Sequence, residues 1–242
     1  MRKRPEPLWY RGDLSLLERP KVSVVGTRRP NAYTKAAVTR LASALAKRGV
    51  AVVSGAAMGV DALAHRGAGA SNTIAVLGCG LNRRCPSLNA QLIESIEREG
   101  LVTSPFEPDF DARPWTFVAR NEIVVALGEV LVVAQADRNS GSMRSVAYAK
   151  AMGKRIFVLP HRLGESEGTN DLLAAGEAEA IYDIDAFAGN FGVGVPADED
   201  EFLAFCKGRP TYEEAAKRFG ERLFEAELEG LVAVVDGRVV PL

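Results

Sequence analysis

Short apolar runs alternate with longer amphipathic stretches through the first three quarters of the chain. The runs are rich in Val, Ile, Leu and Ala without polar alternation, which is typical of strands buried on both faces of a sheet. The stretches between them have apolar residues at the spacing of a helix. We expect strands at residues 21–25, 50–54, 73–77, 129–134 and 155–159, and helices at residues 34–48, 59–67, 89–99 and 142–152.

This alternation predicts the fold class. Strands joined by right-handed helical crossovers form a doubly wound parallel sheet with helices on both faces. We therefore expect an α/β domain over residues 21–190, preceded by a lead-in segment at residues 1–20.

A glycine-rich stretch at residues 187–196 separates this domain from a smaller one at residues 197–242. Helical patterns run over residues 198–206, 211–219 and 221–229, and Thr211 with Glu214 has the spacing of a capping box. Two apolar runs then flank Asp236-Gly237, which favours a hairpin turn. Three short helices and a hairpin are typical of a winged-helix-like domain.

Charge is unevenly distributed between these two domains. From Ala197 onward the chain has 6 basic and 11 acidic residues, a net charge of −5, whereas the preceding residues carry a net charge of +4. A polyanion should therefore bind to the larger domain and be repelled by the smaller one.

The cysteines are few and scattered, at positions Cys79, Cys85 and Cys206. We expect reduced thiols, no disulfide framework and no metal site. No apolar run approaches the roughly 18 residues of a membrane span. The first residues lack the apolar core of a signal peptide, so we expect a cytoplasmic protein that does not contact membranes.

The loops that follow the strands are the expected ligand site of such a sheet. Glycine lets backbone N–H groups approach an anion, helix N-termini favour negative charge, and arginine forms forked bonds to phosphate. No GxGxxG or GxxxxGK[ST] pattern occurs, so we expect no nucleotide cofactor. Each loop alone is equally explained by a tight turn. Together they give as candidate phosphate ligands Gly26, Thr27, Arg28, Arg29, Ser54, Gly55, Arg120, Asn121, Ser140, Gly141 and Ser142.

Two aromatic residues, Trp115 and Phe117, lie just before Arg120. Aromatic rings beside basic residues are stacking platforms for the bases of a single strand, and packing in the core is the alternative for each ring. We expect His65, one turn after Asp61, to be a structural hydrogen-bonding residue, and Asp61 to anchor its loop. No pattern of nucleophile or paired carboxylates indicates a catalytic residue.

The ordered set of these segments resembles the DNA-processing protein A (DprA/Smf) family over roughly residues 7–187. The resemblance implies an extended Rossmann-like fold that forms a homodimer and binds single-stranded DNA without catalysis. It further implies protection of incoming DNA in natural transformation and loading of the RecA recombinase, and it leaves open weaker binding of double-stranded DNA. The similar segments are Val24-Val-Gly-Thr-Arg-Arg-Pro30, Val53-Ser-Gly-Ala-Ala-Met-Gly-Val-Asp61, Thr73-Ile-Ala-Val-Leu-Gly-Cys-Gly80, Phe117-Val-Ala-Arg-Asn121, Ser140-Gly-Ser142, Phe157-Val-Leu-Pro160 and Gly168-Thr-Asn170.

The resemblance also assigns a binding pocket, in which Phe117 is the candidate for stacking on a base. The chain departs from the family at Met58, where a basic residue is usual, and Arg66 or Arg29 is the candidate to compensate. It departs again at His161, where the family commonly has glycine, and the role of His161 is open. The phosphate pocket itself is expected to consist of Arg28 and the backbone of Gly26, Thr27, Ser54 and Gly55.

Two other functions compete with this one. A Rossmann phosphoribohydrolase of nucleoside monophosphates would carry a PGGxGTxxE loop, and residues 138–144 have no such carboxylate. A winged-helix regulator of duplex DNA would place its recognition helix among phosphates, which the net charge of −5 opposes. We expect the C-terminal domain to contact protein instead.

Overall fold

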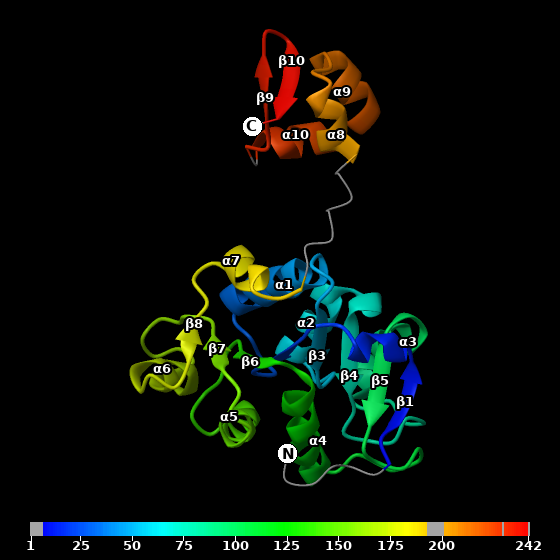
Figure 1. The fold of residues 1–242 in the computed structure, drawn as a ribbon, viewed down its shortest axis with the longest axis vertical. Coiled ribbons are helices and arrows are strands. Elements are labelled where there is room, and N and C mark those ends of the chain that lie inside the picture. The colour runs from blue at the N-terminus through cyan, green and yellow to red at the C-terminus, as the bar shows by residue number, and fades with distance from the viewer. Residues whose placement is uncertain (1–6, 193–200, 229, 242) are drawn as a thin grey trace. The chain divides into compact units, whose positions relative to one another are not determined.

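The computed structural model describes residues 7–192, 201–228 and 230–241, and the chain divides into two compact units, Met1–Gly194 and Val195–Leu242 (Figure 1). The larger unit contains an eight-stranded sheet in the order β1-β5-β4-β3-β2-β6-β7-β8. Its strands are β1 (Trp9–Gly12), β2 (Lys21–Val25), β3 (Ala51–Ser54), β4 (Thr73–Val76), β5 (Leu101–Ser104), β6 (Val130–Val133), β7 (Ile156–Val158) and β8 (Glu179–Ala180).

All neighbouring strands of this sheet are parallel except β1, which pairs antiparallel with β5 at one edge. From β2 the chain builds outward through β3, β4 and β5, and then crosses to β6, β7 and β8 on the other side. The order therefore reverses between β2 and β6, which is the switch point where doubly wound sheets bind ligands. The predicted α/β fold with a doubly wound, Rossmann-like sheet is confirmed.

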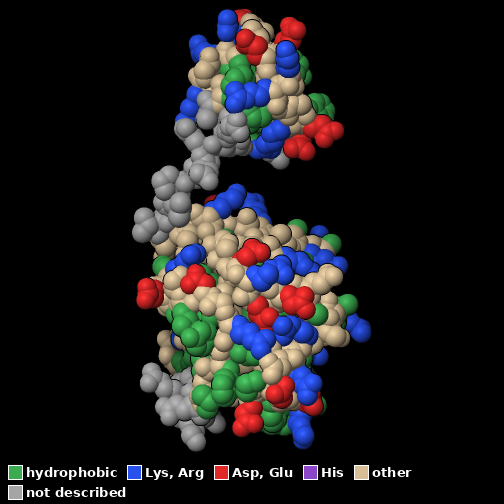
Figure 2. All heavy atoms as spheres, turned by 90° about the vertical axis from the view of Figure 1, so that its right-hand side faces the viewer, with side chains coloured by type: hydrophobic (Ala, Val, Ile, Leu, Met, Phe, Trp, Pro, Cys, Tyr) green, Lys and Arg blue, Asp and Glu red, His purple; other side chains and the backbone are tan. Residues whose placement is uncertain are grey.

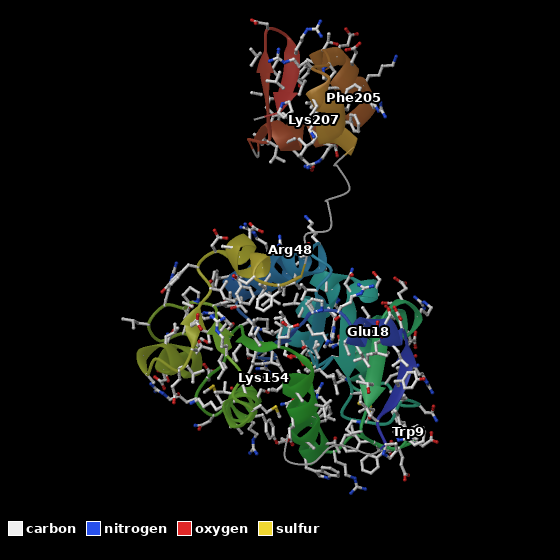
Figure 3. The ribbon with its side chains drawn as sticks, viewed as in Figure 1. Trp9, Glu18, Arg48, Lys154, Phe205 and Lys207 are labelled. Atoms are coloured by element: carbon white, nitrogen blue, oxygen red, sulfur yellow. A yellow bond between two sulfur atoms is a disulfide. The ribbon has the colours of Figure 1, made fainter. Side chains whose placement is uncertain are left out.

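Helices cover both faces of the sheet (Figure 1). Val22, Val52 and Val132 belong to the core under the helices at residues 32–46, 60–68 and 184–189, whereas Val53 and Leu131 belong to the core under the helices at residues 114–127 and 141–151. Arg48, which follows the first of these helices, donates hydrogen bonds to the backbone carbonyls of Gly189 and Phe191 at the end of the larger unit (Figure 3). The helices are α1 (Ala32–Ala46), α2 (Val60–Ala68), α3 (Ala90–Glu99), α4 (Pro114–Leu127), α5 (Gly141–Ala151), α6 (Glu167–Ala174) and α7 (Ile184–Gly189).

The C-terminal unit has helices α8 (Glu201–Lys207), α9 (Tyr212–Phe219) and α10 (Glu221–Leu228), followed by a hairpin of β9 (Val232–Val235) and β10 (Arg238–Pro241). The predicted capping box is present, because the Thr211 N–H donates to Glu214 at 2.8 Å and the Glu214 N–H donates to Thr211 at 3.3 Å. Residues 198–200 of the first predicted helix lie outside the described residues. Three helices and a hairpin around one core give the outline of a winged helix.

One cysteine prediction is wrong. Cys79 and Cys85 form a disulfide, with Cα atoms 6.4 Å apart, because the loop after β4 folds back on itself and brings the two within bonding range. Cys206 is free and buried in the C-terminal unit.

No helix in the described part of the chain is long and apolar enough to cross a membrane. Within the same ranges, no group of three or more His, Cys, Asp or Glu side chains is placed to hold a metal ion.

Candidate nucleic-acid interface

The loops after β2, β3 and β6 meet at the switch point of the sheet. The Thr27 N–H donates to the Gln135 carbonyl at 2.8 Å, and the Asn31 N–H donates to the Gln135 side chain at 3.1 Å. The Val60 N–H, at the start of α2, donates to the Thr27 carbonyl at 3.1 Å. Gly59 has a φ of +77°, and a Cβ there would overlap the backbone of residues 27 and 28. The three loops are therefore held against one another as one frame.

Arg120 lies buried beneath this frame and is 2% exposed. Its Nη1 donates to the Val76 carbonyl at 2.5 Å, and it packs so closely on Gly55 that a Cβ there would overlap the guanidinium. Burial lowers the pKa of Arg120 to about 10, and the nearby Asp61 opposes that shift. Arg120 therefore stays charged at neutral pH, and its Nε has no hydrogen-bond partner among the described residues.

Asp61 anchors the loop after β3, as predicted. Its carboxylate accepts from the backbone N–H groups of Gly55 at 3.2 Å and Ala57 at 3.4 Å. Burial raises the pKa of Asp61, while Arg120 and these two bonds act in the opposite direction. The Gly55 N–H is thus already engaged by a carboxylate.

His65 supports the same loop from below. It is fully buried, its Nδ1 lies 2.6 Å from the Thr73 hydroxyl, and its Nε2 accepts from the Ala56 N–H at 3.3 Å. Because the Thr73 hydroxyl itself donates to the Val52 carbonyl, Nδ1 carries the ring proton. Burial, with a smaller contribution from Arg120, lowers the pKa of His65 to about 3. The prediction of a structural histidine is confirmed.

Arg28 and Phe117 form the exposed part of the site. The Arg28 guanidinium carbon lies 5.9 Å from the centroid of the Phe117 ring. That ring is half-buried and packs on Gly78, where a Cβ would lie 2.7 Å from the ring edge. The positive charge of Arg28 also contributes to lowering the pKa of Arg120. The loop after β2 and helix α4 thus bring together an exposed cation, an aromatic ring and a second, buried cation. We call Arg28, Phe117 and Arg120 the Arg28 site.

The charge of Arg28 is not compensated by a neighbouring acid. Arg28 makes no ion pair within the described residues. Several other arginines of the larger unit are paired, such as Arg84 with Glu97 at 2.6 Å and Arg83 with Asp111 at 3.1 Å. The face toward the β1 edge likewise mixes basic and acidic side chains (Figure 2). A cation without an ion pair is available to a phosphate group, which can form charge-assisted hydrogen bonds with it in place of water.

Other predicted site residues lie apart from this cluster or bond within the protein. Trp115 is 55% exposed but packs edge-on against Phe106 and Phe110, at 5.6 and 6.1 Å, in a separate aromatic group after β5. The Ser54 hydroxyl is buried and donates to the Val24 carbonyl at 2.6 Å.

The remaining predicted residues surround the frame. Arg29 is exposed beside Arg28, Arg66 is exposed in the last turn of α2, and Asn121 is half-buried on α4. Ser140 precedes α5, and its buried hydroxyl has no partner among the described residues. Gly26 and Thr27 belong to the frame, Gly141 is exposed, and Ser142 is nearly buried.

Sequence reasoning missed the residues that hold the frame together. Gln135 joins two loops through both its backbone and its side chain. Asn89 donates to the carbonyls of Ala56 and Ala57 at 3.0 and 3.1 Å. Neither residue stands out by periodicity, since each is a single polar residue next to a helix or strand.

Comparison with known proteins gives consistent matches. The family model described as DNA recombination-mediator protein A matches residues 1–192. The DNA processing protein DprA of Bacillus subtilis is 32% identical over 162 residues, which are 66% of this chain and 54% of that protein. DprA of Streptococcus pneumoniae is 35% identical over 176 residues, 71% of this chain and 62% of that protein. The chain spans about half the length of several curated relatives that it matches.

Solved structures give the same result. DNA processing protein A from Helicobacter pylori, described for its single-stranded DNA binding mode, is 42% identical with a TM-score of 0.77, and the match covers 78% of this chain and 88% of that one. DprA from Streptococcus pneumoniae is 33% identical with a TM-score of 0.71, over 76% and 66%. A molybdenum cofactor binding protein from Rippkaea orientalis, 17% identical with a TM-score of 0.51 over 71% and 94%, shares the fold alone.

Proposed function

Because the chain belongs to the DNA recombination-mediator protein A family, we propose that it binds single-stranded DNA and does no chemistry on it. The observation that carries the proposal is the Arg28 site, in which a guanidinium without an ion pair among the described residues lies over an aromatic ring, 5.9 Å from its centroid. The Helicobacter pylori relative, described by its single-stranded DNA binding mode, supports the choice of ligand.

Each part of the Arg28 site has a task in this proposal. Arg28 binds a backbone phosphate through a charge-assisted, forked pair of hydrogen bonds. Phe117 stacks on a base, which every base permits because each has a π-face. Arg120 stays buried and contributes positive potential from below. The other proposed DNA ligands are Gly26, Arg29, Arg66, Asn121, Ser140, Gly141 and Ser142. Ser54, Gly55 and Thr27 are not among them, because their hydroxyl or backbone N–H groups already bond within the protein. Trp115 is left out because it packs in a separate aromatic group.

The frame explains why the Arg28 site would bind a strand with high affinity. The loops after β2, β3 and β6 are fixed to one another by backbone bonds before any ligand arrives. Little conformational entropy is then lost when the strand binds, which favours affinity.

We further propose the wider role that the family resemblance implies. In it, the protein acts in the cytoplasm as a homodimer, protects single strands taken up in natural transformation and passes them to the RecA recombinase. Duplex DNA binds more weakly, because its bases are not free to stack on Phe117.

The test is fluorescence anisotropy of labelled oligo-dT and a matched duplex across a salt series, with wild type and Arg28→Ala. We expect tight single-strand binding that weakens with salt, a loss of about tenfold or more in Arg28→Ala, and a shallower salt slope in that variant. Arg98→Ala, an exposed arginine on α3, is the matched control. Absence of binding near physiological salt, or binding indifferent to Arg28, would refute the proposal.

A further inference from the structure

A second hollow lies at the same edge of the sheet, outside the Arg28 site. It is a cavity of about 460 Å³ between the start of α1 and the loop after β7. No residue of the Arg28 site contributes to it. The hollow is lined by Asn31, Ala32, Tyr33, Pro160, His161, Arg162 and Glu165.

His161 lies at the floor of this hollow with an unused polar atom. Its side chain is fully buried, and its Nε2 lies 2.9 Å from the Ala134 carbonyl, which only accepts, so Nε2 carries the proton. The other ring nitrogen, Nδ1, has no hydrogen-bond partner among the described residues. The Glu165 carboxylate is 3.8 Å from Nδ1, which is too far for a hydrogen bond. Buried polar atoms without a partner are rare and call for a ligand or a function.

Tyr33 forms an aromatic wall at the mouth of the hollow. It is 46% exposed, and its ring meets the His161 ring edge-on, with centroids 5.4 Å apart. Burial raises the pKa of the Tyr33 phenol, so the ring stays uncharged at neutral pH. An exposed, neutral aromatic face beside a cavity suits stacking by a nucleobase.

The hollow is lined by a cation and a helix N-terminus, which suit an anion, and by acceptors, which suit N–H donors. The Arg162 side chain is exposed and pairs with no acid within the described residues. Beside it begins α1, a 15-residue helix whose first N–H groups have no partner inside the helix apart from the cap that Asn31 gives. The hollow also holds acceptors, the Glu165 carboxylate and the His161 Nδ1. The Glu165 carboxylate accepts from the Asn31 side-chain amide at 3.3 Å, which fixes it beside the helix N-cap.

We propose that this hollow, the Tyr33 pocket, binds one nucleotide of the DNA strand. The base stacks on Tyr33 and presents N–H donors to Glu165 and His161, while the phosphate lies between Arg162 and the first turn of α1. Cytosine, adenine and guanine each carry an exocyclic amino group with two N–H donors for the two acceptors. Thymine has a single N–H donor, on its ring N3, so the pocket prefers the first three. This inference rests on the proposed function and adds a subsite with base preference to it.

One strand reaches both sites. Asn31 follows Arg28 by three residues, so their Cα atoms are at most about 11 Å apart. Both sites are also fixed to the end of β6: the Ala134 carbonyl holds His161, and the next carbonyl, of Gln135, holds Thr27. A strand anchored on Arg28 is therefore presented to the Tyr33 pocket at a fixed distance.

The experiment compares oligo-dC with oligo-dT, two pyrimidine strands that differ in the amino group. Anisotropy is measured for wild type, Tyr33→Ala, Arg162→Ala and Glu165→Gln. The matched controls are Tyr182→Ala and Arg98→Ala, since Tyr182 is 84% exposed and neither residue lines the pocket. A parallel calorimetric titration with the free mononucleotide dCMP separates a strand subsite from a site for free nucleotides.

We expect wild type to prefer oligo-dC, and Tyr33→Ala and Arg162→Ala to bind it about fivefold or more weakly. The controls should stay within about twofold, and Glu165→Gln should lose most of the preference for dC. If the protein binds dCMP, loses that binding in Tyr33→Ala and binds no DNA strand, the pocket is supported as a nucleotide site and the proposed function is refuted. Equal binding of dC and dT, unchanged in Tyr33→Ala while Arg28→Ala still loses affinity, would overturn the pocket and leave the proposed function standing.

Discussion

The Arg28 site and the surface of the C-terminal unit differ in charge and in the side chains that they expose. In the Arg28 site an unpaired cation and an aromatic ring stand on loops fixed by buried polar groups. In the C-terminal unit, α10 occupies the position of a recognition helix, yet it exposes Phe224 and Leu228, 60% and 73%, on a helix that also carries Glu221 and Glu225.

This difference indicates what each surface can bind. A polyanion needs cations that are not already neutralised, and it gains affinity from aromatic platforms. Carboxylates repel phosphate, and exposed apolar side chains among them suit a protein partner instead. We therefore expect DNA to bind to the larger unit and a protein partner to contact the C-terminal unit.

The largest expected effect comes from disturbing the buried side of the Arg28 site. Gly55→Ala would push its Cβ into the Arg120 guanidinium and break the bond to the Val76 carbonyl. Leaving that charge buried without its partner costs about 3–5 kcal/mol of unfolding free energy. Urea denaturation measures the loss. Gly141→Ala is the control, because nothing lies within 4 Å of its Cβ; equal midpoints for the two variants would contradict this account.

Acidification should weaken the same region through His65. Its pKa is about 3 in the folded state, against 6.5 for a histidine exposed to water as in the unfolded chain. The unfolded chain therefore takes up the proton first, and the stability present above pH 6.5 is lost as the pH falls toward 3. At pH 5 the loss is about 2 kcal/mol.

The control for this effect is His65→Gln, which cannot titrate. Asp61 contributes with the opposite sign, because its raised pKa favours the folded state in acid, and that contribution is common to both proteins. The difference in unfolding free energy between wild type and His65→Gln should therefore shrink between pH 7 and pH 5. A constant difference would show that His65 is not held neutral by burial.

A smaller effect should separate the two aromatic candidates. Phe117→Ala removes the ring beside Arg28 and should weaken oligo-dT binding by about 1–2 kcal/mol. Trp115→Ala should have less effect, because that ring is already packed against Phe106 and Phe110. Anisotropy at one salt concentration measures both, and the reverse order would move the stacking platform to the Trp115 group.

The smallest effect is expected in the C-terminal unit. Phe224→Ser changes an exposed side chain and should leave oligo-dT affinity within about twofold and unfolding free energy within ~0.5 kcal/mol. A tenfold loss of DNA affinity in this variant would erase the contrast between the two surfaces.

Sequence periodicity predicted the central strands because each is a short, fully buried apolar run between polar segments. It missed β1, β5, β8, α4, α6 and α7, and the segment at residues 1–20, expected to be an irregular lead-in, supplies the edge strand β1. β5 has only two apolar residues, Leu101 and Val102, before Thr103 and Ser104, so it does not form an apolar run. α4 ends in the β-branched run Ile123-Val-Val125, which is buried and resembles a strand. The Cys79–Cys85 disulfide was missed because spacing does not show how a loop folds back.

For the candidate site, the sequence indicated which residue types gather but not their roles. Arg28 and Phe117 were expected beside the same pocket, with core packing as the alternative for Phe117, and they lie together with the Phe117 ring half-buried. Arg120 was expected among the phosphate ligands and is instead buried under Gly55, a fact that depends on tertiary packing alone. The unpartnered Nδ1 of His161 is likewise invisible in a sequence, because it depends on which nitrogen the Ala134 carbonyl engages.

The most direct test of the account is oligo-dT binding by a chain ended at Gly194, compared with the full chain in the same buffer. The contrast between the surfaces predicts that removing the acidic unit leaves the dissociation constant within about twofold or lowers it, with the same sensitivity to Arg28→Ala. A loss of more than about tenfold in the shortened chain, with the larger unit still folded by circular dichroism, would contradict the account and place DNA binding in the C-terminal unit.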